Sequence, residues 1–473
     1  MKKSKLTELF SQFNRKEYRW FRDFLASPYF NKNEDIIRLG DIYLQLAKKG
    51  FPPKATQAES IFATLFPRQP FDEKKLTYLS SDLLQLGERF LAQRHFEAEE
   101  ENNNLVRLRA CYDRKLKKSY HANLRKSTAL LQREQPLSPK LLYQRFQLQA
   151  IMQEEFAQSG ERTASPHLQG TADQLDNCYF ANKLKLSCGM LNIQLALNHE
   201  YTQRFTQADY LREIDELPNN VLPRLYALAF RLLQTENRED LLDTYFSELT
   251  QCATRLDAIE VTELFYYAIN YTARQFRLGH RHFATSLLRI YQTGLDRGFL
   301  LEDNVLSPWN YKNIVKLGLG LRQFEWVKDV VNQYTDLLPP ENRSDARHFN
   351  LADIAYHQQQ YDQAFHHLGQ TEFTDVYYAI GAKVMLIKIY YETGAEEALL
   401  ALLFSFRLFL MRNRLVGQAT KDVYLNFVRF TKKLQRATDV KDLEALKNSI
   451  LGTKALSERN WLLRQIAEKT LKL

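Results

Sequence analysis

Four breaks between predicted helices recur at similar distances along the second half of the chain. They lie near Gly279, Gln323, Gln360 and Gly394, so successive breaks are 44, 37 and 34 residues apart. Repeats of this period consist of two helices joined by a turn, and a single pair cannot bury its own apolar face. Neighbouring pairs must therefore stack, which predicts an open-ended solenoid over residues 221–473 rather than a closed globule.

The composition favours helices over the whole length. Only 16 of the 473 residues are glycine and 13 are proline, while Leu, Gln, Glu, Lys, Arg and Ala, all good helix formers, fill the long runs between them. We find no convincing β-hairpin signal. Because one compact core rarely exceeds about 250 to 300 residues, we predict an all-α protein of several parts.

The segment from Asp345 onward carries the clearest repeat motif. Counted from Asp345, Leu351 and Ala352 occupy the Leu-Gly pair of a tetratricopeptide repeat, and Tyr356 stands beside its first-helix aromatic position. The second-helix aromatic and small positions hold Tyr361 and Ala364. The preceding pair, counted from Pro308, also matches, through Tyr311, Ile314, Phe324, Val327 and Pro339. Residues 308–400 thus resemble tetratricopeptide repeats, although the last pair has a shorter turn and lacks the second aromatic residue.

This resemblance implies a right-handed α-solenoid whose first helices line a groove for a peptide or a partner protein. By the same resemblance, the residues expected to face the groove are Lys312, Lys316, Asp353 and Tyr356. A final amphipathic helix with Leu463, Ile466 and Leu471 is expected to cap the stack.

Three regions are predicted. Residues 1–101 form an N-terminal helical module, residues 102–220 a region of long helices with a mobile loop near 158–170, and residues 221–473 the solenoid. Asn14 followed by Glu17 predicts a capping box, Ser27-Pro28 a helix end, and Ser138-Pro139 a helix start.

The motifs that usually carry chemistry are missing from the sequence. Gly318-Leu-Gly320 is the only Gly-x-Gly, and it lies inside a predicted helix, which favours helix packing over phosphate binding. His280 with His282, and His366 with His367, are not spaced as metal ligands on one helix face. No group of nucleophile, base and orienting residue emerges. We therefore predict no catalytic residues, no metal and no cofactor.

One segment concentrates positive charge. Between Arg107 and Lys126 there are eight basic residues and one acidic residue, Asp113. The segment therefore has a local charge of +7, within a chain of formal charge +9. On one continuous helix over 105–134, Arg107, Arg114, Lys118 and Arg125 would form a narrow stripe. Such a stripe fits phosphates or an acidic protein, although a solvated helix face is the simpler interpretation.

The start of the chain lacks the apolar core of a signal peptide, and the most apolar run, Ala398 to Leu410, is too short to cross a bilayer, which takes about 20 residues. Four dispersed cysteines indicate neither disulfides nor zinc. We expect a cytoplasmic, non-enzymatic scaffold that binds a protein or peptide. The alternative is a helical protein associated with nucleic acid or the ribosome through the basic stripe. The sequence leaves the oligomeric state open.

Overall fold

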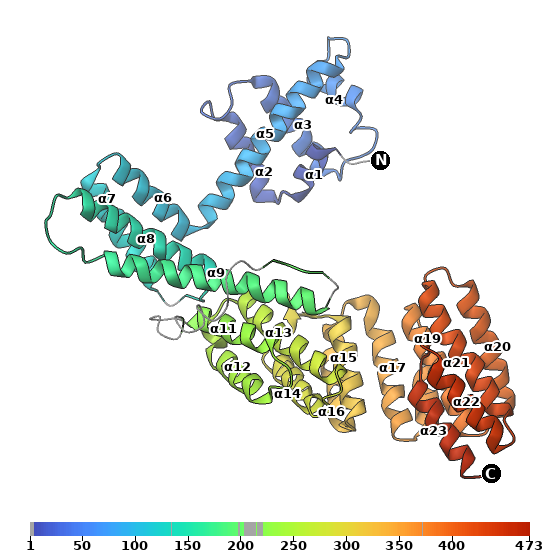
Figure 1. Ribbon diagram of the computed structural model, residues 1–473. Helices are drawn as coiled ribbons and strands as arrows, with labels where there is room; N and C mark the ends of the chain where they lie inside the picture. Colours follow the sequence, from blue (N-terminus) through green and yellow to red (C-terminus); the bar gives the residue numbers. More distant parts are fainter. Residues whose placement is uncertain (1–3, 134, 197–198, 203–213, 215–220, 371) are drawn as a thin grey trace. The chain divides into compact units, whose positions relative to one another are not determined.

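The computed structural model describes the 473-residue chain except residues 1–3, 134, 197–198, 203–213, 215–220 and 371 (Figure 1). The described residues contain 22 α-helices and one pair of two-residue strands. The predicted all-α class is therefore confirmed. Two compact units divide the chain, one built mainly from residues up to Asn182 and the other mainly from Lys183 onward. The division falls within one long helix, and the boundaries expected near 101 and 220 stay predictions.

The first unit contains eight complete helices and the start of a ninth. They are α1 (Lys5–Gln12), α2 (Arg15–Ala26), α3 (Glu34–Lys48), α4 (Ala58–Leu65), α5 (Glu73–Ala98), α6 (Glu100–Asp113), α7 (Lys117–Gln132), α8 (Pro139–Gln158) and α9 (Leu168–Ala196). The stretch between α8 and α9 has no regular structure, which confirms a loop within the predicted 158–170 segment.

The second unit begins within α9. Its further helices are α11 (Val221–Gln234), α12 (Glu239–Cys252), α13 (Ala258–Arg277), α14 (Phe283–Asp296), α15 (Pro308–Gly320), α16 (Phe324–Tyr334), α17 (Pro340–His357), α18 (Tyr361–Leu368), α19 (Val376–Glu392), α20 (Glu396–Arg412), α21 (Gln418–Arg436), α22 (Val440–Gly452) and α23 (Arg459–Thr470). Two short 3₁₀ turns follow α12 and α16, at Ala253–Arg255 and Thr335–Leu337.

The local helix signals act as predicted. The Asn14 Oδ1 atom accepts from the amides of Lys16 and Glu17 at 2.9 and 3.0 Å, and the Glu17 carboxylate accepts from the Asn14 amide at 2.8 Å. This reciprocal pairing satisfies amides that the first turn leaves free. Helix α2 ends before Ser27, and the Ser138 hydroxyl caps α8 by accepting from the Leu141 amide at 3.2 Å.

Helices α1 to α5 share one aromatic core. Neighbouring ring centroids lie 5.2 to 6.4 Å apart among Phe10, Phe13, Phe21, Phe24 and Phe90. All five rings are buried, and full burial of one such side chain contributes about 1.5 to 3 kcal/mol. This core joins α1, α2 and α5, which are separated along the sequence.

The continuous helix expected over 105–134 is wrong, because the chain turns back between α6 and α7. Lys115 takes a left-handed conformation with φ of 56°, and the Leu116 amide donates to the Cys111 carbonyl at 2.9 Å. A non-glycine residue in this region costs about 1 to 2 kcal/mol. The core between α6, α7 and α8, with buried Leu108, Tyr120 and Leu131, offsets that cost.

All four turns predicted in the second half are confirmed. Gly279 lies between α13 and α14, Gln323 precedes α16, Gln360 precedes α18, and Gly394 lies between α19 and α20. Figure 1 shows the consecutive helices of the second unit following one another through the green, yellow and red parts of the chain. Each helix from α11 to α23 contacts the next one directly. Helices α16 and α17 are also connected through the 3₁₀ turn between them, which contacts both. In addition, α11 contacts α13, α15 contacts α17, α17 contacts α19, and α21 contacts α23.

A short antiparallel hairpin interrupts the helices at a place where the sequence shows no convincing hairpin signal. Strands β1 (Leu301–Glu302) and β2 (Val305–Leu306) are joined by Asp303 and Asn304, at φ of 50° and 62°. Asp and Asn tolerate this conformation. The Asp-Asn turn lacks the glycine of the usual Asn-Gly and Asp-Gly hairpin signals.

Gly318 allows α15 and α16 to approach closely. A Cβ atom at this position would lie 2.4 Å from the Val327 Cγ2 atom. The Gly-x-Gly sequence thus serves helix packing, as predicted. No described helix combines the length and the apolar character needed to cross a membrane.

Candidate functional site

The four residues predicted to face a groove differ in their surroundings. Lys312 and Lys316 lie on α15, half-buried and exposed respectively, whereas Asp353 and Tyr356 lie on α17. Although α15 and α17 are in contact, no hydrogen bond or ion pair among the described residues joins either lysine to Asp353. The four residues therefore fall into two pairs. Lys312 and Lys316 form one pair, and Asp353 and Tyr356, which contact other side chains of the protein, form the other.

Neither Lys312 nor Lys316 forms an ion pair among the described residues. Burial lowers the pKa of Lys312, and the charge of Lys316 lowers it further, against an opposing effect of Asp375. Asp375 is already engaged, because its Oδ1 atom caps α19 by accepting from the amides of Tyr377 and Tyr378 at 2.8 and 3.0 Å. An acidic group from outside would meet two like charges that favour its binding.

Asp353 and Tyr356 are bonded within the protein. The Asp353 carboxylate lies 3.2 Å from the His357 Nδ1 atom. Tyr356 is only 7% exposed, so the prediction that it lies on an open groove is wrong. Its hydroxyl donates to Glu392 at 2.7 Å. The cause is packing, because Tyr356 belongs to a buried apolar cluster that includes Met385 and Ile389 of α19.

Glu392, the last residue of α19, accepts three hydrogen bonds from three other helices. The Tyr356 hydroxyl and the Trp461 indole N–H donate to Oε1 at 2.7 and 2.6 Å, and the Tyr361 hydroxyl donates to Oε2 at 2.7 Å. Arg464 lies 3.7 Å away, and the Glu392 side chain is 14% exposed. We call these residues the Glu392 cluster.

The donors of the Glu392 cluster stay protonated. Burial raises the pKa of Tyr356 strongly and that of Tyr361 to about 12, and the Glu392 carboxylate adds to both shifts. A hydroxyl held in this way cannot serve as a base near neutral pH. The cluster therefore joins α17, α18, α19 and α23. Sequence reasoning missed Glu392 because its partners lie 31 to 69 residues away.

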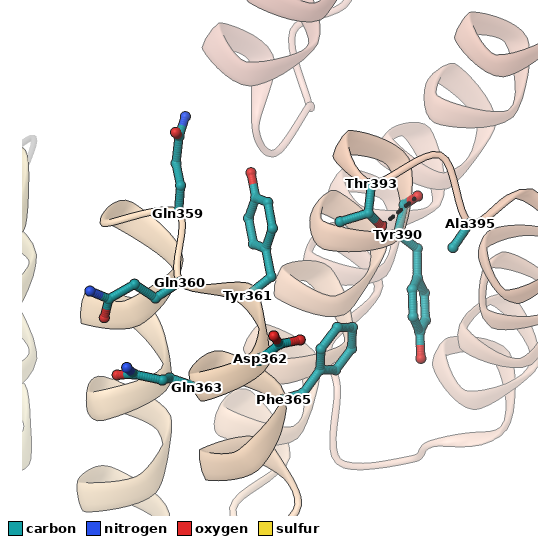
Figure 2. A pocket seen from close by; sticks show the side chains of 9 residues that line it. All are labelled: Gln359, Gln360, Tyr361, Asp362, Gln363, Phe365, Tyr390, Thr393 and Ala395. Carbon is teal, nitrogen blue, oxygen red and sulfur yellow. Dashed lines mark hydrogen bonds between the residues drawn. The ribbon is translucent and has the colours of Figure 1, made fainter.

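A shallow depression of about 540 Å³ adjoins this cluster at the turns before α18 and α20 (Figure 2). It is lined by Gln359, Gln360, Tyr361, Asp362, Gln363, Phe365, Tyr390, Thr393 and Ala395. Figure 2 shows the Gln360 and Gln363 side chains extending away from the Tyr390 ring. Small-molecule sites instead bring a few polar groups to one point, and this depression lacks that arrangement.

The basic stripe is divided by the turn between α6 and α7. Arg107 lies on α6, Arg114 ends it, and Lys118 and Arg125 lie on α7, all exposed. The predicted alignment on one helix is therefore wrong. Instead, Arg114, Lys115, Lys117 and Lys118 gather around the turn. Two other basic residues of the segment are paired, since Arg109 contacts Glu154 at 2.6 Å and Lys126 contacts Glu100 at 3.0 Å.

A second buried polar group joins α9, α11 and α13. The Lys185 ammonium lies 2.6 Å from Glu260 and 2.9 Å from Glu263. The Tyr226 hydroxyl donates to the other oxygen of Glu260, which is 4% exposed. Nearby Cys188 is fully buried, and burial raises the pKa of its thiol well above the usual value. An inert thiol and a closed ion pair indicate a structural connection.

Three histidines lie near one another on α17 and α18. Burial lowers the pKa of His348, the charge of Arg347 lowers it further, Asp345 opposes the shift, and His366 lowers it again. Burial and the charges of His366 and His348 lower the pKa of His367. Among the residues that the structure describes, no His, Cys, Asp and Glu side chains form a group suited to a metal ion.

This arrangement predicts acid sensitivity. Because the folded pKa values of His348 and His367 lie below the ordinary 6.5, their contribution to stability is present above pH 6.5 and is lost as the pH falls through the folded values. We expect H348Q/H367Q to reduce the loss of thermal stability between pH 7.5 and 5.5 by about 2 to 4 °C, measured by circular dichroism at constant ionic strength. H121Q, at an exposed histidine of α7, is the matched control. An unchanged pH dependence in the double variant would contradict the assignment.

Comparison with protein-family models, curated proteins and solved structures finds no match for this chain.

Proposed function

We propose that the chain is a non-enzymatic scaffold that binds a protein or peptide on a right-handed, tetratricopeptide-like solenoid. The helix contacts support this proposal, since consecutive helices pack together and several helices also contact the next but one. The turns before α16, α18 and α20 are 37 and 34 residues apart, close to the period of such repeats. The location we propose is the cytoplasm.

The observation that carries the proposal is the lysine pair on α15, which forms no ion pair among the described residues. Lys312 is half-buried beside Lys316, and burial and the like charge disfavour its ammonium form more than Asp375 favours it. An Asp, Glu or terminal carboxylate of a partner would supply that charge and form a charge-assisted hydrogen bond. We therefore infer an acidic segment as the ligand of this face.

The alternative function, association with nucleic acid or the ribosome, is favoured by a separate surface. Arg114, Lys115, Lys117 and Lys118 are exposed around the turn between α6 and α7. Positive side chains grouped in this way attract phosphates, and such binding weakens steeply with salt.

One capture experiment distinguishes the two functions. The full chain is immobilised and incubated with lysate of its native host, with and without nuclease, and bound proteins and nucleic acids are quantified. We expect K312E/K316E to lower the capture of at least one protein by about tenfold or more, because charge pairs between partners are reversed. R114E/K118E should leave that protein unaffected.

The matched control is K432E/K447E, which reverses two exposed lysines on α21 and α22. Identical protein lists for wild type and K312E/K316E would remove the groove assignment. Capture that disappears with nuclease and depends on Arg114 and Lys118 would favour the alternative function.

A further inference from the structure

Helix α20 has two apolar faces, and only one is covered. Leu399, Leu403, Phe406 and Leu410 are buried in the core that α20 shares with α19 and α21. A second row follows at helical spacing, with Leu400, Phe404 and Met411 exposed and Leu408 half-buried between them. Phe404 is 66% and Met411 57% exposed. We call this row the α20 stripe.

The exposed α20 stripe has the character of an interaction surface. A helix that is apolar on both sides is normally buried on both, and a contiguous row of large exposed apolar side chains marks an interaction surface. At 1.5 Å per residue the row from Leu400 to Met411 is about 16 Å long, the length of three helical turns. In Figure 1, α20 lies beside α19 and α21 in the orange-to-red part of the chain.

The charges along α20 indicate which kind of partner would bind the α20 stripe. Glu396 and Glu397 begin the helix, whereas Arg407 and Arg412 lie in its last two turns and Arg414 lies just beyond its end. All five are exposed. Among the described residues, Glu397, Arg407, Arg412 and Arg414 form no ion pair. A helix that is acidic at its start and basic at its end is complementary to the same helix running in the opposite direction.

We propose that the α20 stripe associates with the α20 stripe of a second copy of this chain, antiparallel and about a two-fold axis. A register that places Leu400 opposite Met411 of the second copy also places Phe404 opposite Arg407. It brings Glu397 to the end of the second α20, where Arg414 follows the helix. The first contact is apolar, the second is a cation–π contact, and the third is an ion pair. The symmetry repeats each contact, as in any isologous interface.

The interface is small, so the dimer is weak. One helix face from each copy lies below the size of standard stable interfaces, and a dissociation constant in the micromolar range is expected. This association is separate from the proposed binding at Lys312 and Lys316.

The test is sedimentation velocity of the full chain from about 1 to 200 µM, a range that brackets a micromolar dissociation constant. We expect the weight-average sedimentation coefficient of wild type to rise with concentration toward that of a dimer. F404E should remain monomeric throughout, while Y78E, at an exposed tyrosine of α5, should behave as wild type. Because both side chains are exposed, circular dichroism should show that both variants fold.

Charge reversal tests the antiparallel register. E397R alone and R414E alone should each weaken association about fivefold or more, and E397R/R414E should restore it, because the double variant exchanges the two partners of the same pair. A monomer at every concentration would overturn the proposal and leave the α20 stripe to a different partner. Association unaffected by F404E, or not restored in the double variant, would overturn it equally.

Discussion

E392A is expected to lower the opening free energy of α17, α19 and α23 by about 3 to 5 kcal/mol, because it leaves three donors and a nearby arginine around an empty site. The Glu392 carboxylate is the common acceptor for Tyr356, Tyr361 and Trp461. None of these donors has a second carboxylate within hydrogen-bond distance among the described residues. Loss of the acceptor therefore affects several helices together.

Hydrogen exchange of the full chain, followed by mass spectrometry, measures this effect locally. Peptides from α17, α19 and α23 should exchange faster in E392A, and peptides from α1 to α5 serve as the internal reference. E444A, at an exposed glutamate of α22, is the matched control. E392Q should fall between wild type and E392A, since an amide keeps one acceptor oxygen. Equal protection of α23 in wild type and E392A would show that the cluster does not hold this helix.

E260L is expected to lower the opening free energy of α11 and of the described part of α9 after Asn182 by about 3 kcal/mol. The substitution leaves the Lys185 ammonium with Glu263 as its one carboxylate partner, and it removes the acceptor of the Tyr226 hydroxyl. The affected groups are buried or half-buried. Removing one partner of a buried ion pair is more costly than removing both. K185M/E260L should therefore recover part of the loss.

Hydrogen exchange again provides the measurement, with peptides from α9, α11 and α13 compared between the single variants, the double variant and wild type. E325L, at an exposed glutamate of α16, is the control. Additive effects of K185M and E260L would indicate that the two side chains do not stabilise the fold as a pair.

The elements that could be predicted from sequence are those determined within a few residues. The caps at Asn14 and Ser138 depend on a side chain and an amide two or three positions away. The turns at Gln323, Gln360 and Gly394 mark changes in local apolar spacing. Such signals need no knowledge of distant contacts, which is why they were predicted at the correct residues.

The candidate site was only partly predictable. The resemblance to a repeat predicts Lys312 and Lys316 as groove residues, and the structure leaves them without an ion-pair partner among the described residues. The same resemblance predicts Tyr356 as a groove residue, but Tyr356 is buried and its hydroxyl donates to Glu392. The basic residues were expected on one helix, although neither glycine nor proline marks the turn at Lys115. Packing of Leu108 and Tyr120 makes that turn favourable.

By itself, the sequence determined the helical class, the helix starts and the spacing of the helix pairs, because propensity, capping and apolar period act over one or two turns of chain. Only the tertiary structure determined which polar side chains form hydrogen bonds or ion pairs within the protein and which do not. Glu392 accepts hydrogen bonds from side chains up to 69 residues away in the sequence. Helix α20 has one apolar face that is buried and another that is exposed. Both outcomes depend on which surfaces meet in space, which no local pattern specifies.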